Sequence, residues 1–265
     1  MRLASLCAGF ESFMLLLFNN LLRDSIYGMV MRVSIGAFLS LLDAGTDMYV
    51  LISYYSAGLY AQANILLAMI ASNMFVQCLA VLAIYAKKSW QRKLYEVMIT
   101  LTFLRPPVDA YRVSTNQIDD ENAVGVLEEM MYNKGAELGC ESIPGCVLQC
   151  WVFLKNSEQA GKFAALSILI SALTTGYSSA MISFDIDVDL SHRKLQPHFY
   201  GYIPDDNSSR GRAFMLMTAI SAIHNLSLSV GCALFALTDM DLLLTFVGGE
   251  FAVLLAVKIL RGDFM

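Results

Sequence analysis

The sequence predicts an all-α membrane protein, a polytopic bundle of about six spanning helices plus one re-entrant or interfacial helix. Two observations predict this class. Hydrophobic residues make up 57% of the chain and charged residues only 15%, whereas soluble domains average about 45–50% and about 25%. The apolar residues also form runs such as 65–86 and 163–183, each long enough to cross a hydrocarbon core of about 30 Å. We therefore expect a single multi-pass membrane domain over residues 1–265.

The elements follow from the order of the apolar segments along the chain. Spans are expected at 33–55, 60–86, 136–154, 163–183, 213–237 and 242–260. We expect residues 1–32 to form an interfacial N-terminal segment, because Glu11 interrupts their apolar stretch and no small-residue cleavage site follows. Residues 87–135 and 184–212 are polar enough to be cytosolic loops.

The loop 87–135 contains a short apolar element that is too short to span a membrane. As a helix, its core at 94–104 would be about 16 Å long, or about half a bilayer. Arg105, Pro106 and Pro107 then end it, because proline removes a backbone donor and restricts the residue before it. We expect a re-entrant or interfacial helix here rather than a seventh span.

The positions of Lys and Arg predict the orientation. If the N-terminus is cytosolic, 16 of the 18 Lys and Arg residues belong to the cytosolic side, and only Lys155 and Lys162 lie outside. Cytosolic loops carry an excess of these residues in membrane proteins. Both termini are therefore predicted to be cytosolic, with short external turns at 56–59, 155–162 and 238–241.

Motifs for most kinds of chemistry are missing from the sequence. It has no P-loop, no H-E-x-x-H zinc motif and no G-x-S-x-G nucleophile motif. The six cysteines lie mostly in apolar runs without a C-x-x-C pair, and the three histidines are scattered. We expect no enzymatic activity, no catalytic residue, no metal or other cofactor, and no nucleic-acid partner.

Acidic side chains inside the predicted spans are the main functional signal. Asp43 and Asp47 are four residues apart, so they share one helix face. An Asp at the centre of a span costs about 2.5–3.5 kcal/mol, so the pair costs roughly 5–7 kcal/mol. The nine Leu, Ile, Val and Phe residues of 33–55 offset only roughly 3–5 kcal/mol. This helix therefore needs neighbouring helices or water along its polar face.

Other spans repeat the pattern and extend the candidate track for a lipid or other substrate. Its members are Asp43, Asp47, Gln77, Glu137, Glu141, Gln149 and Glu250. Pro144 should kink the third span just beyond Glu141, because it frees the carbonyl of Cys140. Two interpretations remain. Ionisable groups inside a membrane usually mark a polar pathway, whereas polar groups can also hold helices together through hydrogen bonds.

Two stretches resemble the XK-related membrane proteins, the family of XK/Kell-type scramblases. The stretch "LLDAGTDMYVLISYYSAGLYAQANILLAMIASNMFVQ" (41–77) is similar to the opening spans of this family, and "ELGCESIPGCVLQ" (137–149) is similar to its Glu-x-x-Pro-Gln-x-x-x-Gln segment. The matching residues are Asp43, Thr46, Asp47, Tyr54, Tyr55, Gly58, Val76, Gln77, Glu141, Pro144 and Gln149. Gly145 departs from the usual glutamine. The loop "PHFYGYIPDD" (197–206) is similar instead to uncharacterised multi-pass proteins of unicellular eukaryotes, which makes this a divergent member.

The resemblance implies phospholipid scrambling, the energy-independent exchange of lipids between leaflets, in the plasma membrane. Membrane phospholipids would be the ligands, and acids on adjoining helices could attract their amine groups. Two alternatives stay open. The chain could be a membrane scaffold or adaptor that docks a lipid-transfer or other protein partner through its basic cytosolic loops. It could also be a small-solute or ion transporter that uses the acidic sites.

Overall fold

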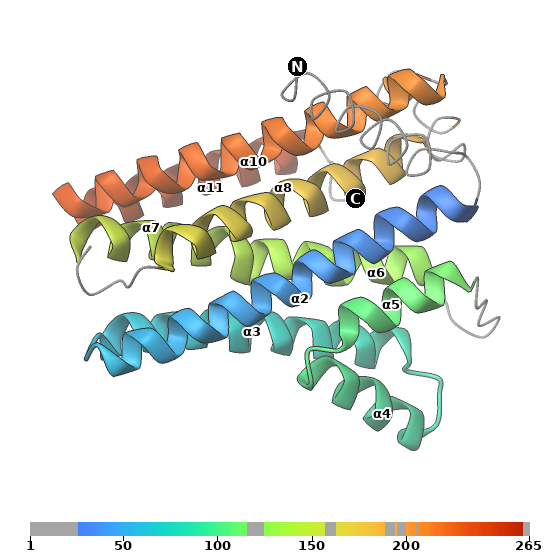
Figure 1. Ribbon diagram of the computed structural model, residues 1–265, viewed down its shortest axis with the longest axis horizontal. Coiled ribbons are helices and arrows are strands. Elements are labelled where there is room, and N and C mark those ends of the chain that lie inside the picture. The colour runs from blue at the N-terminus through green and yellow to red at the C-terminus, as the bar shows by residue number, and fades with distance from the viewer. Residues whose placement is uncertain are drawn as a thin grey trace, which may run out of the picture.

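The computed structural model describes residues 26–115, 125–156, 163–188, 194, 200–204 and 206–261, and helices are the regular elements of this part of the chain (Figure 1). Five of these helices are long and apolar enough to cross a membrane. They cover Gly28–Ser56, Tyr60–Ile84, Ala164–Val188, Ser209–Thr238 and Met240–Leu260. They coincide with five of the six predicted spans, which confirms the helical membrane bundle.

The chain begins with an antiparallel pair, α2 (Ile26–Ser56) and α3 (Tyr60–Ile84). Gly58 in the turn between them has φ 76°, a conformation that glycine adopts without a Cβ clash. With 31 residues, α2 is about 46 Å long and begins before the predicted boundary at 33. The end of the predicted interfacial segment 1–32 is therefore helical, and residues 1–25 lie outside the described part.

The predicted third span, 136–154, lies within a longer helical run of three consecutive pieces. These are α6 (Val126–Glu137), the π-helical turn η1 (Leu138–Ser142) and α7 (Ile143–Lys155). Pro144 lies in the first turn of α7, so the irregular turn directly precedes the proline, close to the predicted kink. Residues 126–135 belong to this run rather than to the predicted loop 87–135.

A helical hairpin connects α3 to α6. α4 (Trp90–Leu101) begins at Ser89, whose side chain accepts a hydrogen bond from the Arg92 backbone N–H, and α5 (Arg105–Ser114) leads back. The prediction that the proline pair ends the element was half right. α4 does end at Leu101, but the prolines start a second helix, where a missing N–H leaves nothing unpaired. The turn reaches the level of Asp43, near the middle of α2, which is the position that a re-entrant hairpin would have.

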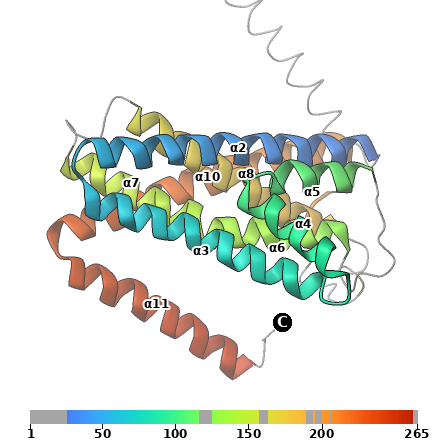
Figure 2. The same cartoon turned by 90° about the horizontal axis from the view of Figure 1, so that it is seen from below.

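The second half of the chain holds α8 (Ala164–Val188), α10 (Asn207–Thr238) and α11 (Met240–Arg261). The predicted cytosolic loop 184–212 is shorter than expected, because α8 and α10 extend into it. α8 packs against α10 at Gly176. α11 contacts α10 and lies apart from α3 (Figure 2), and all of its most apolar stretch is exposed.

The interior of the bundle is polar in many places, whereas its exterior is largely apolar. Apolar clusters do form, one around Tyr177, Met181 and Phe214 between α2, α8 and α10, and another around Tyr54 and Leu66 between α2, α3 and α7. Charged and amide side chains lie buried between these clusters, while many Leu, Ile and Phe side chains are exposed on the outside. In a membrane the hydrocarbon covers that exterior, so any polar chemistry must lie inside.

Candidate functional site

A line of buried polar side chains follows the inner face of α2. Arg32, Ser40, Asp43 and Asp47 are all less than a tenth exposed. Their spacings of eight, three and four residues keep them on one side of a helix. From Arg32 to Asp47 the line extends about 22 Å along the helix axis, which is most of the hydrocarbon thickness.

The two aspartates of this line bind to three other helical pieces. Ser171 of α8 donates a hydrogen bond to Asp43 over 2.6 Å, and Ser142 of η1 donates a longer one of 3.4 Å. Gln149 of α7 donates to Asp47 over 2.7 Å. Among the described residues neither aspartate has an ion-pair partner. Both carboxylates thus accept hydrogen bonds, but no described Lys or Arg side chain forms a direct ion pair with either of them.

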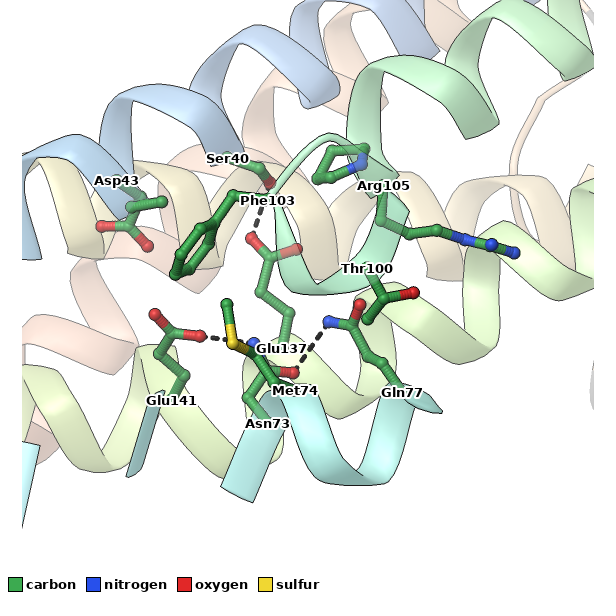
Figure 3. Close-up of a pocket in the computed structure, with 12 residues that line it drawn as sticks. Ser40, Asp43, Asn73, Met74, Gln77, Thr100, Phe103, Arg105, Glu137 and Glu141 are labelled. Carbon is green, nitrogen blue, oxygen red and sulfur yellow. Dashed lines mark hydrogen bonds between the residues drawn. The ribbon is translucent and has the colours of Figure 1, made fainter. Parts of the chain in front are cut away.

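Two glutamates complete an acidic cavity between α2, α3 and the π turn (Figure 3). Glu141 accepts a short hydrogen bond from Asn73, which in turn accepts one of 2.8 Å from Gln77. Glu137 accepts a hydrogen bond of 2.6 Å from Ser40. The cavity has a volume of about 40 Å³, enough for about three water molecules. Its lining residues are Ser40, Asp43, Ala44, Asn73, Met74, Gln77, Thr100, Phe103, Arg105, Pro106, Glu137 and Glu141.

The structure brings most of the sequence-predicted track together and leaves one member apart. Asp43, Gln77, Glu137 and Glu141 line the cavity, and Asp47 with Gln149 follows directly along α2. Glu250 is exposed on α11, a helix that contacts α10 and not α2 or α3. Glu141 of this track lies inside the bundle beside α2, because it is 5% exposed and shares the cavity with Asp43.

The sequence did not predict a buried ion-pair cluster that lies between the two arms of the hairpin. Arg105 contacts Glu96 at 2.8 Å and Asp109 at 2.9 Å, and it makes a short contact with Glu129 of α6. Arg112 contacts Glu96 at 2.6 Å. From the sequence, these arginines were expected to matter for orientation alone. The one local signal was the spacing of Arg105 and Asp109, which puts opposite charges one helical turn apart.

The ion-pair cluster holds three carboxylates against the two buried guanidinium groups of Arg105 and Arg112, and Arg92 pairs with Glu96 from an exposed position. Burial raises the pKa of Asp109, and the charge of Arg105 opposes this shift without cancelling it. The same two causes act on Glu129, whose pKa is also raised. Arg105 is therefore the largest single contribution that opposes the effect of burial on these two carboxylates.

Lys134 was also predicted wrongly, as a residue of a cytosolic loop. It is buried on α6, where its ammonium group contacts Ser40 and lies 3.1 Å from Glu137. A smaller cavity of about 10 Å³ lies beside it and shares Gln77, Arg105 and Glu137 with the acidic cavity. The polar interior is thus continuous from the ion-pair cluster to the aspartates of α2.

This arrangement is chemically suited to contact with a hydrated or cationic group. Within the described ranges no group of three or more His, Cys, Asp or Glu side chains could hold a metal ion. The carboxylates instead face a small cavity beside serine and amide side chains, which can exchange hydrogen bonds with a passing ligand. No protein-family model, no curated protein and no solved structure matches this chain.

Proposed function

We propose that this protein is a phospholipid scramblase, in which lipid headgroups cross the membrane along the polar face of α2. The observation that carries the proposal is the line from Arg32 to Asp47, buried within a helix that can span a membrane. A headgroup that leaves water loses its hydrogen bonds, and an aligned series of polar side chains replaces them. The carboxylates of Asp43 and Asp47 attract the amine of phosphatidylserine, phosphatidylethanolamine or choline lipids.

The resemblance to XK-related proteins gives the proposal independent support. The first motif contributes Asp43 and Asp47, and the second contributes Glu141, Pro144 and Gln149. These motifs are about a hundred residues apart, yet Gln149 binds Asp47 directly. Two separate matches that form one site favour a shared function. With the charge bias of the loops, the resemblance also supports a plasma-membrane protein with cytosolic termini.

A second candidate is a transporter of protons or small cations. The observation that favours it is the size of the acidic cavity, about 40 Å³, which holds a few water molecules but no lipid headgroup in this conformation. The third possibility is an adaptor for a lipid-transfer protein. Such an adaptor would use its basic cytosolic segments and would move nothing without its partner.

Reconstitution of the purified protein separates these functions. Liposomes are loaded with headgroup-labelled fluorescent lipid, and a membrane-impermeant reductant bleaches the label in the outer leaflet. A scramblase exposes the inner-leaflet label as well, whereas liposomes with heat-denatured protein keep it. A parallel set of liposomes reports proton and potassium flux with enclosed dyes. Ion flux without lipid exchange would favour the transporter, and silence in both assays would contradict the scramblase and leave the adaptor.

A further inference from the structure

The turn that joins α4 to α5 holds a residue in an unfavourable backbone conformation. Phe103 has φ 58°, and it is the one non-glycine residue with positive φ in the described part of the chain. A side chain as large as phenylalanine is rarely found there, because Cβ crowds the backbone carbonyl. Such a conformation persists where its surroundings enforce it, and it is frequent at functional sites. Glycine would fit this backbone without strain, so the retained ring points to a role for the side chain.

The ion-pair cluster holds the two arms of the hairpin in place. Arg105 follows the turn by two residues and binds Glu96 of α4 and Glu129 of α6. Pro106 and Pro107 fix the direction in which α5 leaves the turn, because the ring of proline restricts φ. The two arms of the hairpin are thus tied to each other and to the bundle, and the strained turn at 102–104 lies beyond these ion pairs.

The ring of Phe103 lies at the acidic cavity. Figure 3 shows it pointing between the carboxylates of Asp43 and Glu137, and it also packs against the apolar cluster around Leu66. Serine and asparagine side chains donate hydrogen bonds to the carboxylates on their other sides. An aromatic ring offers no comparable hydrogen bond, so on this side it excludes water and narrows the cavity.

We propose that Phe103 is a gating residue, whose ring restricts the acidic cavity until the tip of the hairpin withdraws. This inference rests on the proposed function, because a phospholipid headgroup is the ligand that needs the wider cavity. It accounts for a cavity that is smaller than a headgroup in a protein with a transmembrane polar line. The ion-pair cluster keeps the two arms in place while the turn at 102–104 moves.

Cysteine labelling tests the gate without depending on lipid transport. Ala44 lines the cavity and is half-buried. An Ala44→Cys variant of the full chain is reacted with a hydrophilic, membrane-impermeant thiol reagent, and mass spectrometry follows the modification of that peptide alone. We expect Phe103→Ala to increase the labelling rate several-fold. Leu104→Ala is the matched control, because Leu104 is an exposed neighbour in the same turn, and it should leave the rate unchanged.

Further variants separate the ring from the strain. Phe103→Gly removes both, and it also serves if Phe103→Ala fails to fold. Equal acceleration in the alanine and glycine variants supports a gate formed by the ring, while acceleration in alanine alone would overturn it, because strain would then be the cause. Unchanged labelling in either folded variant would also overturn the gate.

Lipid exchange provides the second measurement. In liposomes, Phe103→Ala should scramble several-fold faster than the parent protein, and Phe103→Trp should not. If the parent moves no lipid while the labelling result holds, the scramblase proposal fails and the gate stands as a feature of another transport function. If the parent moves lipid but Phe103→Ala moves it at the parent rate, the gate fails and the scramblase proposal stands.

Discussion

Gln149 of α7 donates a hydrogen bond to Asp47 of α2, with 2.7 Å between its Nε2 and the carboxylate Oδ1. Both residues are almost completely buried, and they lie 102 positions apart in the sequence. An amide can hold a carboxylate in place, but it does not balance the negative charge. A neutral asparagine at position 47 could accept the same hydrogen bond. The choice of an ionisable side chain at this position therefore needs another explanation, and the proposed track supplies one.

Replacing both aspartates of α2 tests the track directly. Asp43→Asn/Asp47→Asn keeps the size and the acceptor oxygens and removes the charge. We expect the variant to fold and reach the membrane, because it lowers the cost of inserting α2. Its rate of lipid exchange in liposomes should fall by about tenfold or more, which corresponds to about 1.4 kcal/mol in the barrier.

The control for this variant is Asp239→Asn/Asp241→Asn. These aspartates lie exposed where α10 ends and α11 begins, so the change in net charge is the same while the track is untouched. Lipid exchange at the parent rate in both double variants would leave the helix-stabilising interpretation of Asp43 and Asp47. A loss in both would mean that net charge rather than position matters.

Glu141 and Glu250 make a second matched pair of acids. The sequence assigns both to the track, but only Glu141 lies in the cavity, while Glu250 is exposed on α11. Glu141→Gln keeps an acceptor for Asn73 and should slow lipid exchange several-fold, because it removes a charge from the cavity. Glu250→Gln should leave the exchange rate unchanged. Equal effects on the fluorescent-lipid rate would contradict the track as the structure places it.

The ion-pair cluster should contribute strongly to stability. Arg105→Met leaves Glu96, Asp109 and Glu129 with less positive charge nearby, and removal of one member of a buried ion pair costs about 3–5 kcal/mol. Thermal unfolding of the detergent-solubilised protein measures this loss. Arg92→Met is the control, because Arg92 pairs with Glu96 from an exposed position and should cost at most about 1 kcal/mol.

The effect of Arg105→Met should also depend on pH. Burial raises the pKa of Asp109 and Glu129, and the charge of Arg105 is the largest contribution that opposes this rise. In the Arg105→Met variant this contribution is missing. An acid whose pKa is raised in the folded state favours folding at low pH, and this contribution is lost as pH rises through the folded pKa. The deficit of the variant should therefore shrink on acidification below neutral pH. A deficit that grows on acidification would mean that the remaining contacts lower these pKa values.

Gly176 should be essential for the contact between α8 and α10. A Cβ atom at this position would lie 2.6 Å from the backbone nitrogen of Ala222, so one helix would have to move. Gly176→Ala should lower stability by about 1–3 kcal/mol or more. Gly45→Ala is the control, because its Cβ would meet nothing within 4 Å and alanine favours a helix. Comparable melting temperatures for the two variants would contradict the close packing.

Apolar runs and insertion energies made part of this structure predictable. The runs marked five spans that the structure contains, because a membrane helix needs about 20 apolar residues. The cost of Asp43 and Asp47 predicted their burial against other helices, which the structure shows. Pro144 marked the irregular turn beside Glu141. These features depend on the local sequence and on the surrounding solvent, so they can be predicted from a single sequence.

Features that depend on distant partners could not be predicted in this way. Lys134 and Arg105 look like cytosolic loop residues, because a lone charge is normally solvated. The burial of Lys134 depends on Ser40, which accepts a hydrogen bond from it, and that of Arg105 depends on Glu129, which balances its charge. Both partners lie in other helices of the chain. Glu250 shows the opposite error. Hydropathy alone assigns an acid within a span to an internal track, but the position of α11 outside the bundle leaves it exposed.

The two ends of the hairpin are expected to lie on the same side of the membrane. Trp90 at the start of α4 and Thr115 just after α5 are exposed, and the turn between them lies at the level of Asp43. A re-entrant hairpin returns to the side from which it entered, and in the proposed orientation, which rests on the Lys and Arg residues of the loops, that side is the cytosol. Trp90→Cys and Thr115→Cys should therefore react with an impermeant thiol reagent only after the plasma membrane is opened. Asn156→Cys, at the end of α7, should react in intact cells. Labelling of Trp90→Cys from outside would reverse the orientation, and labelling of the two hairpin positions from opposite sides would make the hairpin a span.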